Sequence, residues 1–210
     1  MVFSDTPSRF VAYWIDLILV GIATSIIAEP FGWNVVAPTD PNQPFDLSAA
    51  LANTEYGILA VVIGGLYFVA SWSGGRRATL GQRLFNIQVA NAFDGRPLSL
   101  EQAIRRWLGL GDFLNLFGFT PALALLSTGL LFIWNVVLLI TTATSPTKQG
   151  LHDRLANSAV VRPTTAGTGL AYGCLAVFVA LVIIAFLAIV ALIFLGTQVS
   201  SILSEVGESV

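Results

Sequence analysis

The chain has 210 residues, of which 55% are hydrophobic and only 10% are charged, and its formal net charge at pH 7 is −2. Soluble globular domains usually carry about 25% charged residues, so this composition excludes an ordinary soluble fold and predicts membrane spans. The single cysteine and the single histidine exclude an internal disulfide and a zinc site built on several Cys and His ligands.

The first apolar run, residues 10–28, is close to the ~20 residues that a helix needs to cross a bilayer core. Asp16 lies inside the run, both Asp5 and Arg9 precede it, and no small-x-small cleavage site follows it. These features differ from those of a secretory signal peptide, so we expect a retained membrane helix.

Asp16 is the most informative residue of this helix, because an ionisable side chain at membrane depth is costly and indicates a functional site. It follows Arg9 by seven positions, so both residues lie on one helix face and can point into the same polar cleft. Three roles are open for Asp16: it binds an ion or a proton, it pairs with an arginine of another helix, or it caps a backbone break near residues 71–73.

A second, uncharged span is predicted for residues 56–72. The segment before it, residues 29–55, contains four acidic residues and no basic residue. Because Lys and Arg concentrate in cytoplasmic loops, we expect this segment outside and the N-terminus in the cytoplasm. Four prolines predict an irregular loop in the first half of the segment, and residues 46–53 predict a short helical lead-in.

Residues 74–83 follow the second span and contain three arginines beside glycines. Such segments can bind phosphate groups, and we expect anionic lipid headgroups at Arg76, Arg77 and Arg105. A simple positively charged anchor on the cytoplasmic side is the alternative.

Alternating side chains over residues 83–90 predict a short strand. Residues 159–161 are a second strand candidate, and we expect the two to pair into a two-stranded cytoplasmic ribbon. Since an isolated hairpin is only marginally stable, the ribbon should rest on the helix ends beneath it.

A basic amphipathic helix is predicted to begin at Ser99, which forms a capping box with Gln102. Its apolar face carries Leu100, Ala103, Ile104, Trp107 and Leu108, and its polar face carries Glu101, Gln102, Arg105 and Arg106. A basic helix with a Trp on its apolar face is typical of the membrane interface, where we expect this helix to lie.

Residues 113–144 are too long for one typical span and short for two, and Pro121 and residues 127–129 interrupt them. A single crossing would place the three basic residues of positions 148–162 outside. Entry and return would instead keep all ten basic residues inside, so the charge distribution favours a hairpin.

Residues 148–154 place His152 beside Asp153 with basic residues around them, a pattern that can titrate near neutral pH. Without a nucleophile or a second histidine the pattern gives little support to catalysis. The alternative is a charged turn in which Asp153 pairs with a nearby arginine. No Walker, Rossmann or G-x-S-x-G pattern occurs, so we expect no enzyme and no cofactor.

The last apolar run, residues 170–196, predicts the clearest span. Together these elements predict an all-α integral membrane protein with about four transmembrane segments, one amphipathic interfacial helix and the two-stranded ribbon. The absence of disulfides and the charge distribution are typical of a multi-pass protein of the bacterial cytoplasmic (inner) membrane.

These motifs resemble the RDD family, which is named for one arginine and two aspartates in a small membrane domain. The similar positions are Arg9 and Asp16 in residues 7–16, a middle section at residues 78–84 and 94–107, and Asp153 in residues 149–156. The resemblance covers residues 5–163. Asn157-Ser158 stands where a Gly-Thr pair is common, and the span at residues 170–196 lies beyond the shared domain.

The resemblance implies transport, including cation/proton exchange, with Arg9, Asp16 and Asp153 as the ion or proton site. Secondary candidates for the same site are His152, Arg106 and Asp112. A second hypothesis is a non-catalytic accessory or assembly subunit of a larger membrane complex. We expect the lipid bilayer as a partner, including anionic lipids, together with further copies of the chain or other membrane subunits. We expect no nucleic acid and no metal.

Overall fold

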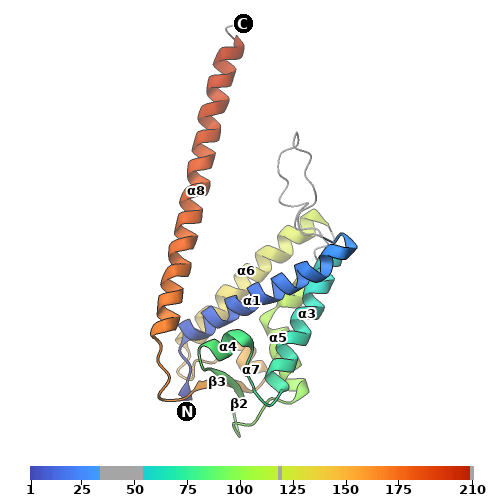
Figure 1. Ribbon diagram of the computed structural model, residues 1–210, viewed down its shortest axis with the longest axis vertical. Coiled ribbons are helices and arrows are strands. Elements are labelled where there is room, and N and C mark those ends of the chain that lie inside the picture. Colours follow the sequence, from blue (N-terminus) through green and yellow to red (C-terminus); the bar gives the residue numbers. More distant parts are fainter. Residues whose placement is uncertain (34–53, 118–119, 209–210) are drawn as a thin grey trace. The chain divides into compact units, whose positions relative to one another are not determined.

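The computed structural model of the chain describes residues 1–33, 54–117 and 120–208, and it divides into a unit of residues 1–168 and a unit of residues 169–210 (Figure 1). In these described ranges four helices are long and apolar enough to cross a membrane, at residues 6–31, 54–73, 122–144 and 169–196. The helical lead-in predicted at residues 46–53 lies outside the described residues, as does most of the predicted loop before it.

Helix α1, Thr6–Ala28, confirms the first predicted helix, and the 3-10 helix η1, Glu29–Phe31, extends it. The helix begins before the apolar run because Asp5 caps it, accepting a hydrogen bond from the backbone N–H of Ser8 at 3.0 Å. Arg162 pairs with the same carboxylate at 3.1 Å. Helix α3, Thr54–Ser73, confirms the second predicted helix and packs against α1.

The sheet at one end of this unit has three short antiparallel strands in the order β1-β3-β2. They are β1 Val2–Phe3, β2 Gln88–Asn91 and β3 Ser158–Arg162. The predicted pairing of the two later strands is confirmed, with Val89 opposite Val160. The predicted ribbon lacked β1, because two residues are too few to show an alternating pattern in the sequence.

The predicted strand at residues 83–90 is wrong in its first half. Helix α4, Leu80–Leu84, occupies that part, because Thr79 and Gln82 form a capping box that starts a helix. Asn86 then has a positive φ of 53°, which turns the chain into β2. A capping signal therefore overrides the alternating pattern until residue 88.

Helix α5, Leu100–Leu110, confirms the predicted start, since Ser99 and Gln102 form the expected capping box. The predicted faces are wrong for Arg106, which is buried on the packed side of the helix with Ala103 and Leu110, whereas Leu100 is exposed. A Cβ added to Gly65 of α3 would lie 3.2 Å from the Trp107 ring. Helix α5 is thus packed along α3. Its position at the membrane interface stays a prediction.

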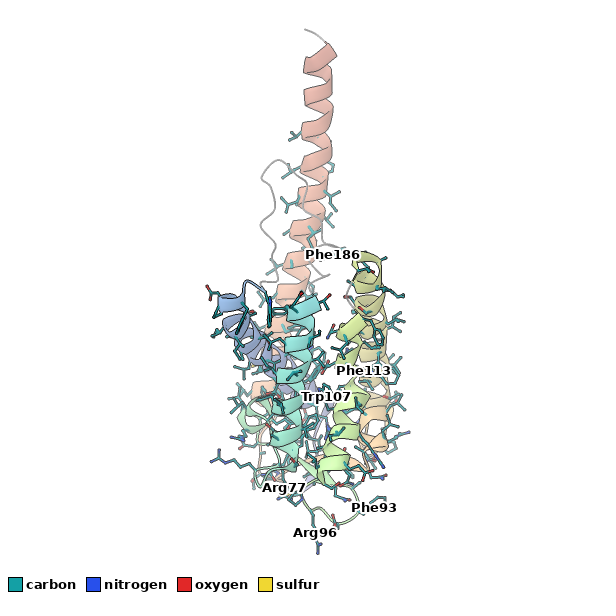
Figure 2. The ribbon with its side chains drawn as sticks, turned by 90° about the vertical axis from the view of Figure 1, so that its right-hand side faces the viewer. Arg77, Phe93, Arg96, Trp107, Phe113 and Phe186 are labelled. Carbon is teal, nitrogen blue, oxygen red and sulfur yellow. The ribbon has the colours of Figure 1, made fainter. Side chains whose placement is uncertain are left out.

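The chain continues through the 3-10 helix η2, Asp112–Phe117, which lies beside the first turns of α3, where a Cβ on Gly57 would be 3.3 Å from the Asn115 carbonyl. In Figure 2, Arg77 and Arg96 lie near one end of this unit and Phe113 lies further along it. The pair α5–η2 therefore runs up the unit, antiparallel to α3.

Helix α6, Pro121–Thr144, returns the chain. The predicted interruptions are wrong: Pro121 stands in the first turn, where a proline is compatible with a helix, and residues 127–129 lie inside a continuous helix. The hairpin predicted within residues 113–144 is not present in that form, because residues 121–144 are one continuous helix that follows the arm α5–η2. How often this region crosses the membrane stays a prediction. The basic residues after α6 come back to Arg9, whose guanidinium bonds the carbonyl of Lys148.

Helix α8, Gly169–Glu208, contains the predicted last span and continues twelve residues beyond its end. In the most apolar 18-residue window of residues 169–196 none of the residues is buried. An apolar helix surface of this size is unfavourable in water and suits a lipid or protein environment.

Candidate functional site

A cavity of about 130 Å³ lies inside the 1–168 unit, among α1, α3, α5, α6 and the short helix α7, Leu151–Leu155. Phe10, Phe68 and Trp72 supply part of its apolar wall. Its ionisable lining residues are Arg9, Tyr13, Asp16, Arg106 and His152. The predicted polar cleft shared by Arg9 and Asp16 is therefore present.

Asp153 lies beside this cavity and is paired with two arginines. Its Oδ2 is 3.0 Å from Arg9 Nη1 and its Oδ1 is 2.8 Å from Arg106 Nη2, and the Asp153 side chain is fully buried. The backbone N–H of Gly150 donates to Oδ2 at 3.2 Å, which starts α7. Burial alone would raise the pKa of Asp153, but Arg106, His152 and Arg9 together hold it below its ordinary value. The carboxylate is thus ionised at neutral pH.

Arg9 joins three parts of the chain that are distant in sequence. Besides Asp153, it bonds the Lys148 carbonyl through Nη1 and the Val160 carbonyl through Nη2, the latter at 3.0 Å. These contacts fix the first turn of α1 against the turn before α7 and against β3. Of the three side-chain nitrogens of Arg9, Nε is the one without a hydrogen-bond partner among the described residues.

Arg106 is almost completely buried, with 4% of its side chain exposed. Its guanidinium carbon lies 4.6 Å from the centre of the Trp72 ring, which is a cation–π contact. Burial lowers the pKa of Arg106 and Asp153 opposes that shift. Its Nη2 faces Asp153, whereas its Nε and Nη1 have no hydrogen-bond partner among the described residues.

His152 approaches the same carboxylate, with Nε2 3.5 Å from Asp153 Oδ1. Burial lowers the pKa of His152 to about 4, and Arg106 and Arg9 add to the effect against the opposing charge of Asp153. The prediction that this pair titrates near neutral pH is wrong, because the histidine is neutral there. Asp153 does form the arginine pair expected of a charged turn.

Asp16 has partners of another kind. Its Oδ1 accepts hydrogen bonds from the Tyr67 hydroxyl at 2.5 Å and from the backbone N–H of Gly81 at 2.8 Å, and its Oδ2 accepts one from Thr79 Oγ1 at 2.5 Å. Only 1% of Asp16 is exposed. No arginine pairs with it in the described ranges. The carboxylate therefore holds the start of α4 and not residues 71–73.

The model of the RDD family matches residues 4–157, which is 154 of the 210 residues. The chain belongs to the RDD family. No curated protein and no solved structure shows a significant match to it.

The three residues expected to define the RDD site fall into two groups. Arg9 and Asp153 are in direct contact, while Asp16 lies on another wall of the same cavity with three uncharged donors. Of the secondary candidates, Arg106 and His152 belong with Asp153. The arginine–aspartate cluster of Arg9, Arg106 and Asp153 is the centre of the candidate RDD site.

Asp112, the remaining secondary candidate, lies in a separate cavity of about 180 Å³ between α1, α3 and η2. Its Oδ1 accepts a hydrogen bond from Tyr13 at 3.0 Å, and Tyr13 lines the first cavity. Burial raises the pKa of Asp112 to about 6, against the lowering effect of the Tyr13 hydrogen bond. Tyr13 thus connects the walls of two cavities in the RDD unit.

The arginines expected to bind lipid headgroups lie outside both cavities. Arg76 is exposed after α3, Arg77 donates to the Gly95 carbonyl at 2.7 Å, and Arg105 pairs with Glu101 on the surface of α5. Figure 2 shows Arg77 near the end of the RDD unit that carries the connection from α3 to α4. Their role as lipid ligands stays a prediction.

Sequence reasoning missed the partners of Asp16 and the burial of Arg106. The first had a signal, since Thr79 and Gln82 have capping-box spacing and place a hydroxyl and free backbone N–H groups together. A Cβ on Gly81 would lie against the Ala12 carbonyl and 3.0 Å from Asp16 Oδ1, so glycine permits the close approach. Arg106 had no local signal, because its partner comes 47 positions later in the chain.

Proposed function

We propose that this RDD protein is a membrane transport protein that carries a small solute through the cavity of its 1–168 unit. The observation that carries the proposal is the pair of unpartnered donors, Nε and Nη1, on the buried side chain of Arg106, which lines that cavity. Buried polar groups normally have partners, and exceptions call for a bound water, ion or ligand.

A purely structural role for the cluster explains less. One arginine is enough to neutralise Asp153, and Arg9 already does so while bonding two backbone carbonyls. A second buried guanidinium adds a desolvation cost without completing its own hydrogen bonds. A solute that accepts hydrogen bonds from Arg106 would offset this desolvation cost and would fill the cavity beside the side chain.

The cavity has room for such a solute. A cavity needs about 10–15 Å³ of probe space to hold one water, so 130 Å³ accommodates several waters or a small molecule. The second cavity, beyond Tyr13 and Phe68, offers a continuation toward the opposite end of the unit. A membrane protein that moves a solute needs access from both sides, and Tyr13 stands at the boundary between the two cavities.

The same proposal includes an orientation. Arg9, Lys148 and Arg162 come together beside the three-stranded sheet, and the positive-inside rule favours the cytoplasm for that end. We infer a multi-pass protein of the bacterial inner membrane with the N-terminus in the cytoplasm. Cysteine-accessibility labelling of single-cysteine variants at Phe93, which is 82% exposed at the same end as Arg96 (Figure 2), and at the exposed Glu29 tests this orientation. Labelling at Phe93 from outside intact cells would refute it.

Flux into proteoliposomes tests transport. The purified chain is reconstituted with entrapped pH-sensitive and chloride-sensitive dyes, and gradients of sodium, potassium, chloride and formate are imposed in turn. We expect at least one flux above that of protein-free liposomes. Arg106→Gln should lower it about 10-fold or more, since a hydrogen bond to a charged group contributes about 1.5–3 kcal/mol. Arg96→Gln is the control, because that side chain is 82% exposed.

Fluxes equal to those of protein-free liposomes under every gradient would contradict transport by the chain alone. An equal loss of flux in Arg106→Gln and Arg96→Gln would show that the flux does not depend on the cavity. Size-exclusion chromatography of each variant shows whether it is still folded.

A second candidate function is that of an accessory subunit, and helix α8 favours it. This helix is a unit of its own, and its apolar window suits contact with lipid or with a membrane partner. The native mass of the protein in mild detergent, with accompanying chains identified by mass spectrometry, tests this role. Fixed stoichiometry with other polypeptides would support it, and a pure homo-oligomer or monomer would count against it.

A further inference from the structure

Most of the unpartnered side-chain atoms around the first cavity are arginine donors. Of the residues that line this cavity, two arginines have three donor nitrogens without an acceptor among the described residues: Nε and Nη1 of Arg106, and Nε of Arg9. The Nδ1 of His152 is also without a partner there. The carboxylate oxygens beside them are all engaged. Both oxygens of Asp153 face arginines, and both oxygens of Asp16 accept hydrogen bonds. Among the charged groups of the cavity, the carboxylates are therefore engaged, whereas the arginines keep free donors.

The charge of the arginine–aspartate cluster points in the same direction. Arg9 and Arg106 carry two positive charges, Asp153 carries one negative charge and His152 is neutral, so the cluster has an excess of one positive charge. A buried charge is stable only when it is paired. A ligand with one negative charge would balance the cluster.

From these observations we propose that the cavity beside Arg106 binds a small monovalent anion, a halide or a short carboxylate, and this deepens the transport proposal on which it rests. The binding groups are the free donors of Arg106, with Arg9 Nε and the excess charge of the cluster in support. Asp16 lines the same cavity and would repel the anion, so the anion occupies the Arg106 side, away from Tyr67 and Thr79.

A cation is the less suitable ligand. Hard cations need several oxygen ligands, and each carboxylate oxygen of Asp16 and Asp153 already has a donor. The face of Trp72 could attract a cation, but the guanidinium of Arg106 occupies it at 4.6 Å.

Equilibrium binding tests the proposal independently of transport. The full-length protein in detergent is prepared in sodium gluconate as the reference salt and then titrated with sodium chloride or sodium formate. We expect saturable heat in isothermal titration calorimetry and a melting temperature that rises with the logarithm of the anion concentration. Potassium and choline chloride should act as sodium chloride does, since the cation is not bound.

Arg106→Lys is the decisive variant. Lysine keeps a positive charge opposite Asp153, but it has three N–H donors in place of five and loses the planar contact with Trp72. We expect about 10-fold weaker anion binding or more, and the melting temperature of the variant in gluconate shows whether it is still folded. A variant with Arg76, Arg77 and Arg96 all replaced by lysine controls for anions on the surface arginines. It should bind as the wild type does.

The outcomes separate the sources and the proposals. Preference for chloride over formate identifies a halide site, and the reverse preference identifies a carboxylate site. Absence of saturable binding for both anions, or unchanged affinity in Arg106→Lys, overturns the inference. Flux of an uncharged solute without anion binding would leave transport standing and remove only the anion site. Anion binding without any flux would leave the anion site standing and remove the transport proposal.

Discussion

Replacing Asp153 by asparagine should be the most damaging isosteric change in the protein. The Asp153 side chain is fully buried, and its two partners, Arg9 and Arg106, are only 10% and 4% exposed. Asn can still accept the hydrogen bond from Gly150, but it leaves two buried guanidiniums without a counter-charge. Removing one partner of a buried ion pair costs about 3–5 kcal/mol, and this is a large part of the ~5–15 kcal/mol that stabilises a typical protein.

Equilibrium unfolding in mixed micelles, followed by tryptophan fluorescence, measures the effect. Asp94→Asn is the matched control, because Asp94 pairs with Arg96 at 3.6 Å on the surface and such pairs contribute about 0–1 kcal/mol. The double variant Asp153→Asn/Arg106→Gln removes one charge of each sign. We expect it to regain about 0.5–3 kcal/mol relative to the sum of the two single changes. A loss below about 0.5 kcal/mol in Asp153→Asn would refute the reasoning, since it is the size of an ordinary surface change.

Three further changes test other parts of the structure. Gly81→Ala should cost about 1–3 kcal/mol of unfolding free energy, because a Cβ meets the Ala12 carbonyl and Asp16. Gly75→Ala is the control and should be nearly neutral, since a Cβ there has nothing within 4 Å. Equal effects of the two changes would contradict the close approach at Gly81. The pKa of His152 is lowered to about 4, so its contribution to stability is present above pH 6.5 and is lost as the pH falls toward 4. His152→Gln should remove that part of the pH dependence of the unfolding free energy. An unchanged pH profile would show that the histidine is not buried in its neutral form. The pKa of Asp112 is raised to about 6, so its contribution to stability is present below pH 3.8 and is lost as the pH rises through 6. Asp112→Asn should therefore gain stability relative to the wild type between pH 4 and 7. A difference in unfolding free energy that stays the same at every pH would argue against the raised pKa.

The helices and their caps were predictable because their signals are local. The runs of apolar residues, the Ser99–Gln102 capping box and the strands around Val89 and Val160 follow from patterns within a few residues. The pairing of these strands was an expectation about two segments 71 positions apart, and the structure confirms it. Pro121 was misleading, because a proline that breaks a helix interior also suits a first turn. The sequence alone does not distinguish these two positions.

The candidate site was predictable only in part, since it depends on contacts between distant segments. Arg9 and Asp153 were singled out through the family resemblance, yet nothing near Arg106 indicates that its side chain turns inward. An amphipathic pattern assigns arginine to the polar face, and burial becomes favourable only because Asp153 and Trp72 meet it in the folded unit. The same applies to Asp16, whose donors Tyr67, Thr79 and Gly81 come more than 50 positions later.

The contact between Arg9 and Asp153 has a consequence for biosynthesis. The two residues are 144 positions apart, and β1 likewise waits for β3. At ~5–20 residues per second, the ribosome needs about 7–30 s to make the chain between the two residues. During that time the first helix is already at the membrane with an arginine that lacks its carboxylate. Newly made chains should therefore depend on the insertion machinery, or on lipid phosphates, to shelter Arg9 until α7 is released.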